Sequence, residues 1–360
     1  MNKRERVMAA VQFRPVDKLP MDFSACDVVL NRLYEYCGVS SYKELLHYLD
    51  CDIVDIRGVV DPKWVAPFPH TFTREDGMIQ NYLGFVKKIQ NTVFGPVPEH
   101  SDYILQDCLD LDEIKEAWQF PRVEWFDFSD MSERIREYQQ DGFAIMASGG
   151  SVFQHPTLIR RMDVFLCDLM TEPEIAEYLM DGYTNFYLDY YRALFEACPG
   201  QIDIFRIADD LGMQDRPLIG ENLFRQFIFP RLKKLCDLAH EYGIKVMFHS
   251  CGCAFPFIGM LIEAGVDILD PLQPNAKDMS PENLHAHYAG KICFHGSIDT
   301  QYTLPKGTEE DVRSQVRKHA EIFTKGGSSF IIAPAHQLQP DVPVENIIAL
   351  YDEARRFPMP

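Results

Sequence analysis

The residues best suited to chemistry in this chain are His249 and Cys251, at the end of the apolar run Val-Met-Phe-His-Ser-Cys at 246–251. In an extended strand, residues two apart project to the same face, so this imidazole and thiol point the same way. Zinc accepts both ligand types, and a catalytic zinc needs only three from the protein. A third ligand, His336, stands in Ala-Pro-Ala-His at 333–336. Spacing alone does not distinguish a metal site from core packing, because cysteine is also a common small buried residue.

The elements that must bring His336 to this pair are short apolar strands that alternate with amphipathic helices. Such alternation is typical of parallel βαβ construction. Strands are predicted at 19–24, 53–59, 143–147, 202–208, 245–249, 268–272, 292–295 and 330–333, and helices at 163–194, 221–242, 255–264 and 309–324. Eight such strands make an α/β chain with a closed (β/α)8 TIM barrel. An open doubly wound sheet is the alternative, but no glycine-rich phosphate loop follows any of the strands.

The segment of about 60–142 breaks this alternation. It carries several prolines, an Asp-Gly pair and short β-like pieces. We therefore expect one barrel domain over 1–360 with a hairpin-rich insertion after the second strand. The insertion either covers the site or mediates pairing of two chains, and the sequence leaves both open.

Further polar residues stand where the predicted strands end, which is where the active sites of such barrels lie. Asp209 and Asp210 are candidates for acid–base catalysis. Because neighbouring residues of a strand face opposite ways, only one of the two is expected to reach the cavity. The candidates for substrate binding are Arg57, Gln154, Gln273, His295 and Asp299. Arg57 either binds a substrate carboxylate or pairs with a nearby aspartate.

The composition excludes some partners. A formal net charge of −19 argues against nucleic acid and anionic membranes, since both require a basic surface. The ten cysteines show no disulfide framework, no apolar run is long enough to span a membrane, and no signal segment follows the charged start. We therefore expect a cytoplasmic protein with reduced thiols.

Several motifs spread along the chain carry a family resemblance. They are Arg-Glu-Arg-Val-Met-Ala-Ala at 4–10, Pro-Val-Asp-Lys-Leu-Pro at 15–20, Asp-Asp-Leu-Gly at 209–212, Phe-His-Ser-Cys-Gly at 248–252, Gly-Ser-Ile-Asp at 296–299, Ala-Pro-Ala-His at 333–336 and Pro-Asp-Val-Pro-Val-Glu-Asn at 340–346. With them the chain resembles the uroporphyrinogen decarboxylase superfamily, which includes cobalamin-dependent methyltransferases. The resemblance implies a (β/α)8 barrel, commonly a homodimer, with its site at the barrel mouth.

The resemblance favours the methyltransferase branch over the decarboxylases. Uroporphyrinogen decarboxylases carry an Arg-Gln-Ala-Gly-Arg stretch after the first strand, whereas this chain has no arginine there before Arg32. The methyltransferases bind zinc through His-x-Cys and a distant cysteine. His249 and Cys251 match the first two, but the third position is His336, which is what the decarboxylases carry. Whether His336 binds a metal or acts as it does in the metal-free enzymes is left open by the sequence.

These observations predict zinc-dependent methyl transfer between a small methylated substrate or thiol and a corrinoid. The resemblance implies cobalamin as co-substrate, carried by a separate corrinoid protein. One alternative is a metal-free lyase or decarboxylase that acts on a carboxylated substrate. Another is a non-catalytic corrinoid- or tetrapyrrole-binding protein.

Overall fold

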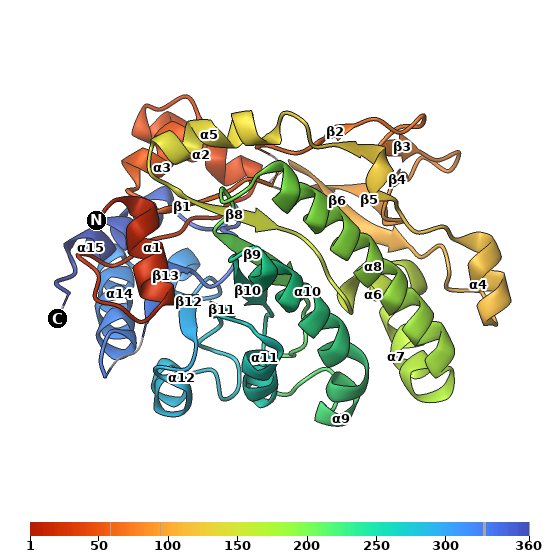
Figure 1. The fold of residues 1–360 in the computed structure, drawn as a ribbon. Helices are drawn as coiled ribbons and strands as arrows, with labels where there is room; N and C mark the ends of the chain where they lie inside the picture. Colours follow the sequence, from red (N-terminus) through yellow and green to blue (C-terminus); the bar gives the residue numbers. More distant parts are fainter. Residues whose placement is uncertain (58, 94, 327–328, 360) are drawn as a thin grey trace.

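The computed structural model describes residues 1–57, 59–93, 95–326 and 329–359. Among these residues, parallel strands form one curled α/β sheet (Figure 1). Its strands, in order across the sheet, are β1 (Ile53–Asp55), β8 (Ala144–Ser148), β9 (Ile204–Ala208), β10 (Lys245–His249), β11 (Ile268–Leu272), β12 (Cys293–Ile298) and β13 (Phe330–Pro334). Neighbours in this order are neighbours in the sequence of parallel strands, as expected for βαβ units.

The first predicted strand, at 19–24, is present only as isolated bridges. Met21 bridges Ile332 of β13, and its carbonyl accepts a hydrogen bond of 2.8 Å from the Asp52 amide beside β1. Pro20 explains the short pairing, because it has no N–H to donate to a neighbouring strand. The segment nevertheless touches both edge strands of the sheet.

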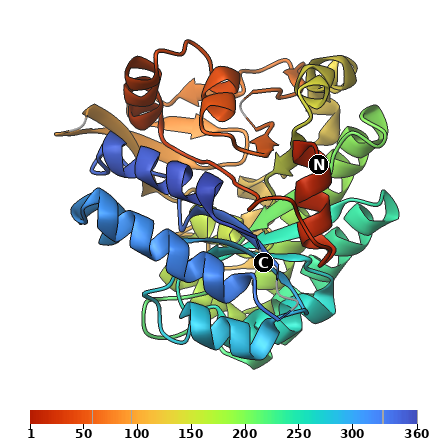
Figure 2. The same cartoon turned by 90° about the vertical axis from the view of Figure 1, so that its left-hand side faces the viewer.

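Helices connect the strands, and several of them cover the outer face of the sheet. They are α1 (Lys3–Val11), α2 (Asp27–Cys37), α3 (Tyr42–Tyr48), α4 (Leu111–Ala117), α5 (Met131–Gln140), α6 (Gln154–Arg160), α7 (Met162–Thr171), α8 (Pro173–Ala197), α9 (Glu221–Leu223), α10 (Phe229–Glu241), α11 (Ile258–Ala264), α12 (Pro281–Tyr288), α13 (Thr303–Lys306), α14 (Glu309–Phe323) and α15 (Val344–Arg356). Figure 2 shows α14 and α15 packed side by side. No helix in these described ranges is long and apolar enough to cross a membrane.

Further predicted elements differ from the structure. The helix expected at 221–242 is interrupted by a π-helical turn at Phe224–Ile228, between α9 and α10. The single helix expected at 163–194 is two, α7 and α8, because Pro173 starts a new helix at a position where it needs no N–H partner. β1 is shorter than the predicted 53–59, and residue 58 lies outside the described residues.

The segment 60–142 holds antiparallel strands together with α4 and α5. The strands are β2 (Lys63–Trp64), β3 (Thr71–Thr73), β4 (Ile79–Asn81), β5 (Val86–Thr92), β6 (Gly95–Asp102) and β7 (Phe126–Asp127). β3 to β6 form one sheet, and β2 pairs with β7. In Figure 1 these strands lie beyond the β1 edge of the parallel sheet.

An apolar layer fills the inside of the curled sheet at the amino ends of its strands. It consists of Val7 and Val11 from α1 with Ile53, Ala144, Met146, Ile204, Met247, Ile268, Cys293 and Ile331 from the strands. The capping box of Asn2 and Glu5 begins α1, which covers this end of the sheet. The other end, where the strands finish, is therefore left for polar residues.

Candidate functional site

A layer of polar side chains lies directly above this apolar layer. In six of the strands a polar residue comes two positions after an inner apolar one and so shares its face, whereas Ile331 of β13 is followed at this spacing by Ala333. The pairs are Ile53 with Asp55, Met146 with Ser148, Ile204 with Arg206, Met247 with His249, Ile268 with Asp270, and Cys293 with His295. The strand periodicity therefore gathers charged and polar groups at the carboxyl ends of neighbouring strands.

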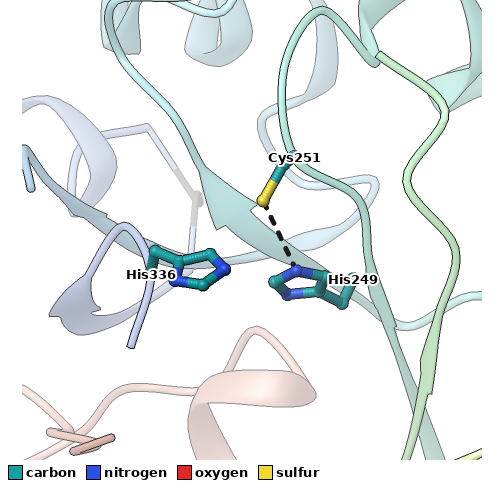
Figure 3. A group of neighbouring side chains, drawn as sticks. All are labelled: His249, Cys251 and His336. Carbon is teal, nitrogen blue, oxygen red and sulfur yellow. Dashed lines mark hydrogen bonds between the residues drawn. The ribbon is translucent and has the colours of Figure 1, made fainter. Parts of the chain in front are cut away.

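The structure brings His249, Cys251 and His336 together at this end. One ligand atom from each residue lies within 4.8 Å of the other two. His249 Nε2 is 3.5 Å from Cys251 Sγ, and the rings of His249 and His336 have centroids 5.9 Å apart. In Figure 3 the three side chains converge from two separate segments of the chain. His249 is buried, Cys251 is half-buried and His336 is exposed, so the cluster is open on one side.

Backbone contacts hold His336 in place from the far end of the chain. His336 stands in the loop after β13, and the Leu338 amide of this loop donates to the Ser24 carbonyl at 2.9 Å. The Cys26 amide donates back to the Leu338 carbonyl at 3.1 Å. The side chain of Gln337 adds a bond of 3.1 Å to the Ala25 carbonyl. The position of the third cluster residue thus depends on the segment at 24–26.

Asp270 orients His249 from behind. Its Oδ2 lies 2.8 Å from His249 Nδ1 and accepts a bond of 2.7 Å from Arg206 Nε. Its Oδ1 lies 2.7 Å from Nδ1 of His295, whose Nε2 is 3.0 Å from Asp22 Oδ2. When Nδ1 of His249 carries the proton, it donates to Asp270 and leaves the Nε2 lone pair directed at the cluster. In the other tautomer, with the proton on Nε2, His249 Nδ1 accepts from Arg206 Nη2 at 2.5 Å. A metal bound to Nε2 would therefore select the tautomer with the proton on Nδ1.

The electrostatics keep this network charged and His249 neutral. Burial alone would raise the pKa of Asp270, but Arg206, His295 and His249 hold it well below its usual range. Burial acts to lower the pKa of His295, yet Asp270 and Asp22 raise it to about 9, so this ring is a cation at neutral pH. Burial and then Arg206 lower the pKa of His249. A neutral imidazole is the form that binds a metal.

The Cys251 thiol is protonated in the absence of a metal. Burial, followed by the Asp210 carboxylate, raises its pKa well above the usual range. Since the thiolate is the form that ligates, binding of a metal would release this proton.

Sequence comparison assigns the family. Residues 97–357 match uroporphyrinogen decarboxylase (URO-D). The chain belongs to the uroporphyrinogen decarboxylase family. The family predicted from the motifs of this sequence is thus confirmed. A comparison with curated proteins finds no match.

One solved structure shares the fold of this family member over its whole length. A methyltransferase from Methanosarcina mazei superposes with a TM-score of 0.68 at 18% identity, over 99% of both chains. A D-psicose 3-epimerase matches with a TM-score of 0.39 at 12% identity, over 65% of this chain and 83% of its own. A xylose isomerase domain protein from Alicyclobacillus acidocaldarius gives 0.32 at 12% identity, over 62% and 80%. The last two scores are too low to carry an argument.

In this URO-D family member, Asp209 and Asp210 occupy different environments. Asp209 is fully buried, and its oxygens accept hydrogen bonds from the Ser151 hydroxyl and from the backbone amides of residues 152–154 at the start of α6. Burial raises its pKa to about 6. Asp210 is more exposed. Its Oδ1 lies 3.9 Å from His249 Nε2 and accepts from the Cys251 amide at 3.0 Å. Of the two, Asp210 is therefore the carboxylate beside the cluster.

Three of the predicted substrate-binding residues form hydrogen bonds to other residues of the site. Gln154 Nε2 donates to Asp210 Oδ2 at 3.0 Å. Gln273 Oε1 accepts from the Gly252 amide at 2.8 Å and so holds the turn that follows Cys251. His295 lies in the Asp270 network, behind the cluster. Any contact of these side chains with a substrate stays a prediction.

Asp299 caps a helix rather than lying beside the cluster. Its carboxylate accepts from the backbone amides of residues 301–303, at the start of α13. Only 3% of Asp299 is exposed. Its predicted contact with substrate therefore finds no support in its hydrogen bonds.

Arg57 follows β1 and borders a separate, small cavity of about 20 Å³, room for about one water molecule. Ser148, Tyr190 and Tyr191 line this Arg57 cavity together with apolar side chains of β8 and α8. None of the three cluster residues lines it. The cavity nevertheless lies at the carboxyl ends of β1 and β8, the same end of the sheet.

Tight backbone packing fixes the loop that carries Cys251. A Cβ atom on Gly212 would lie 2.4 Å from the Cys253 nitrogen, and one on Gly252 would lie 2.4 Å from the Gly212 oxygen. Gly252 also has a φ of +76°, which favours glycine. The loops after β9 and β10 thus pack backbone against backbone.

Asp22, Arg206 and Asp270 are the site residues that the sequence prediction missed. Each is a lone charge within an otherwise apolar strand-like run. A charge buried in a strand requires a partner, and that signal could have marked them as one network.

Proposed function

We propose that this protein transfers a methyl group between a small methylated substrate or thiol and a corrinoid, with zinc held by His249, Cys251 and His336. The observation that carries the proposal is the convergence of these three side chains, with a carboxylate placed behind the first histidine. The URO-D family assignment and the fold shared with a methyltransferase support the reaction class. We further propose that the segment at 19–25 closes the sheet into a (β/α)8 barrel, with this site at its mouth.

The cluster fits zinc in its distances and in its chemistry. Zinc–nitrogen bonds of about 2.0–2.1 Å and zinc–sulfur bonds of about 2.3 Å place tetrahedral ligand atoms about 3.3–3.6 Å apart. His249 Nε2 and Cys251 Sγ are already 3.5 Å apart. The largest separation, 4.8 Å, closes with a small movement of the exposed His336 side chain. Three protein ligands leave one position for substrate, as in catalytic zinc sites.

When bound there, zinc supplies a Lewis acid that polarises the sulfur or oxygen of the substrate. Asp210 lies beside the cluster and takes up the proton of a thiol or hydroxyl that enters. The Gln154 amide and the Cys251 amide hold its two oxygens in position. Gln273 fixes the Cys251 turn, and Asp270 fixes the tautomer of His249.

The corrinoid is a co-substrate in this proposal, presented by a separate protein. The exposed side of the cluster, at His336, is the face from which it would approach. Pairing of two chains as a homodimer remains a prediction.

Metal analysis tests the proposal directly. Protein purified without a histidine tag is expected to contain about one zinc per chain, and Cys251→Ala to contain far less. Cys253→Ala is a matched control, because it removes a thiol only two residues away that is outside the cluster. Zinc well below one per chain, unchanged in Cys251→Ala, would refute the metal centre.

A spectral titration with cobalamin, with and without methylated thiols and ethers, tests the reaction. We expect cobalamin spectra to change only when a methyl donor is present and to stop changing after chelation. Chelator-resistant decarboxylation that depends on Arg57 would identify a lyase instead. Tight pigment binding without turnover would identify a binding protein.

A further inference from the structure

Asp22 and Asp270 hold the ring of His295 between them. Nδ1 of His295 is 2.7 Å from Asp270 Oδ1, and its Nε2 is 3.0 Å from Asp22 Oδ2. An ionised carboxylate only accepts hydrogen bonds, so the ring donates in both directions only when both nitrogens carry a proton. Although burial lowers the pKa of His295, the two carboxylates raise it to about 9. The ring is therefore a buried cation that joins two buried carboxylates.

Asp22 belongs to the segment 19–26, which bridges the two edges of the parallel sheet. The Asp22 amide donates to the Ile332 carbonyl of β13 at 3.0 Å, and the Tyr351 hydroxyl donates to the Asp22 carbonyl at 2.8 Å. Its side chain faces the centre of the site, and only 6% of the residue is exposed. Since a buried carboxylate requires a partner, the pair with His295 fastens this segment to the site.

The same segment holds the loop that carries His336. Leu338, two residues further on, exchanges backbone hydrogen bonds of 2.9 and 3.1 Å with residues 24 and 26. On the other side of His336, the Ala335 amide donates to the Ile298 carbonyl of β12 at 2.7 Å. His336 thus stands between one contact to the sheet and the contacts to this segment. A shift of the segment would move the His336 side of the cluster relative to the sheet.

These contacts form a closed ring around the metal cluster. The ring runs from His249 through Asp270, His295 and Asp22, and returns through residues 22–26 and Leu338 to His336. The two ligand rings at its ends have centroids 5.9 Å apart. Without a cation between them, two buried carboxylates would face each other, and one of them lies on the segment that holds His336. Their repulsion would push that segment away from the sheet.

We infer that His295 is a positioning residue, which fastens the segment 19–26 to Asp270 and so keeps His336 within ligating distance of His249. The effect on ligation rests on the metal centre of the proposed function, whereas the fastening of the segment does not.

Hydrogen exchange of the metal-free protein tests the fastening. In His295→Gln, the backbone amides of residues 22, 26 and 338 are expected to exchange at least about tenfold faster, because glutamine supplies no charge between the carboxylates. Asp22→Asn, a milder change at the other end of the pair, is expected to act in the same direction. His319→Gln is the matched control, because His319 is also buried and bonded to the same strand, at Ser297, but lies outside the ring of contacts. Amides of β8 report any general loosening.

Cobalt(II), which absorbs visible light where zinc does not, tests the effect on ligation. His295→Gln is expected to weaken cobalt binding about 10–100-fold and to give the spectrum of the His336→Ala protein. Adding His336→Ala to His295→Gln should then weaken binding by less than about threefold, because His336 no longer ligates in that background. His319→Gln should leave both the affinity and the spectrum unchanged.

The outcomes separate this inference from the zinc proposal. Unchanged exchange at residues 22, 26 and 338 in His295→Gln and Asp22→Asn overturns the fastening. A full additional loss from His336→Ala in the His295→Gln protein overturns the effect on ligation, even if the segment is loosened. Faster exchange at these amides in a protein whose wild type binds no cobalt supports the fastening and refutes the metal centre.

Discussion

Asp270→Asn is the substitution that best probes the support behind the proposed metal centre. Asp270 is 4% exposed and accepts hydrogen bonds from Arg206, His249 and His295. Asparagine keeps the shape of the side chain, removes its negative charge and replaces one acceptor oxygen by an amide donor. The change leaves the buried Arg206 cation with a weaker partner and no longer fixes the proton on Nδ1 of His249.

Two magnitudes follow from these contacts. Loss of a carboxylate that orients a ligating histidine lowers metal affinity about 10–100-fold, which corresponds to about 1.4–2.7 kcal/mol. Breaking a buried ion pair lowers the free energy of unfolding by about 3–5 kcal/mol. We expect Asp270→Asn at the lower end of this range, because Asp55 also acts on the Arg206 charge.

Zinc affinity is measured by competition with a chromophoric chelator, and stability by urea unfolding of the metal-free protein. Asp267→Asn is the control. Asp267 lies just before β11 and pairs with His240 and Lys245 at the opposite end of the sheet. It should lower stability without changing zinc affinity. An unchanged zinc affinity in folded Asp270→Asn would refute the orienting role of Asp270. An equal loss of zinc affinity in Asp267→Asn would show that the effect reflects general destabilisation of the fold rather than that role.

Further predictions concern the loop, the carboxylates and the pH dependence. Gly212→Ala should weaken zinc binding and lower the unfolding free energy by about 1–3 kcal/mol, because the added Cβ collides with the Cys253 backbone. Gly220→Ala is the control, because no atom lies within 4 Å of its added Cβ. It should change neither the zinc affinity measured by chelator competition nor the stability measured by urea unfolding. Asp209→Ala should lower the unfolding free energy by about 2–4 kcal/mol, because it leaves buried amides at the start of α6 without an acceptor. Asp210→Asn should abolish methyl transfer and leave stability nearly unchanged. The reverse pattern in urea unfolding and methyl-transfer assays would contradict the structural role of Asp209 and the catalytic role of Asp210. Burial lowers the pKa of His319 from 6.5 to about 4, so the unfolded chain binds more protons between these values and the unfolding free energy should fall by about 3 kcal/mol as the pH drops from 6.5 to 4. Urea unfolding of His319→Gln over this range should show a shallower slope, and an unchanged slope would count against the effect.

The strands of this fold were predictable because each is a short apolar run that ends in polar residues. The same alternation placed His249 and Cys251 at a strand end without any knowledge of tertiary contacts. The break at Pro173 was harder to foresee, because the apolar periodicity of α7 continues into α8. The first strand was overestimated because Pro20 cannot donate to a neighbouring strand.

The network of charged residues around Asp270 could not be predicted from the sequence, for a different reason. Asp22, Arg206, Asp270 and His295 come from four separate strand-like segments. Their meeting depends on the register between strands, which no local pattern encodes. The role of Asp209 as a helix cap was hidden similarly, because it follows one strand and caps a helix that follows another.

The loop that carries His336 has a consequence for how the protein is made. Its hydrogen bonds to residues 24–26 join parts of the chain that are more than 300 residues apart, as in the bond from the Gln337 side chain to the Ala25 carbonyl. During synthesis, His249 and Cys251 leave the ribosome well before this loop exists, and the early segment must wait for its partner. A nascent chain therefore offers a metal only two of the three side chains. Under the proposed function, the full set of three ligands therefore forms only after the loop at His336 has been synthesised, so zinc would be bound late.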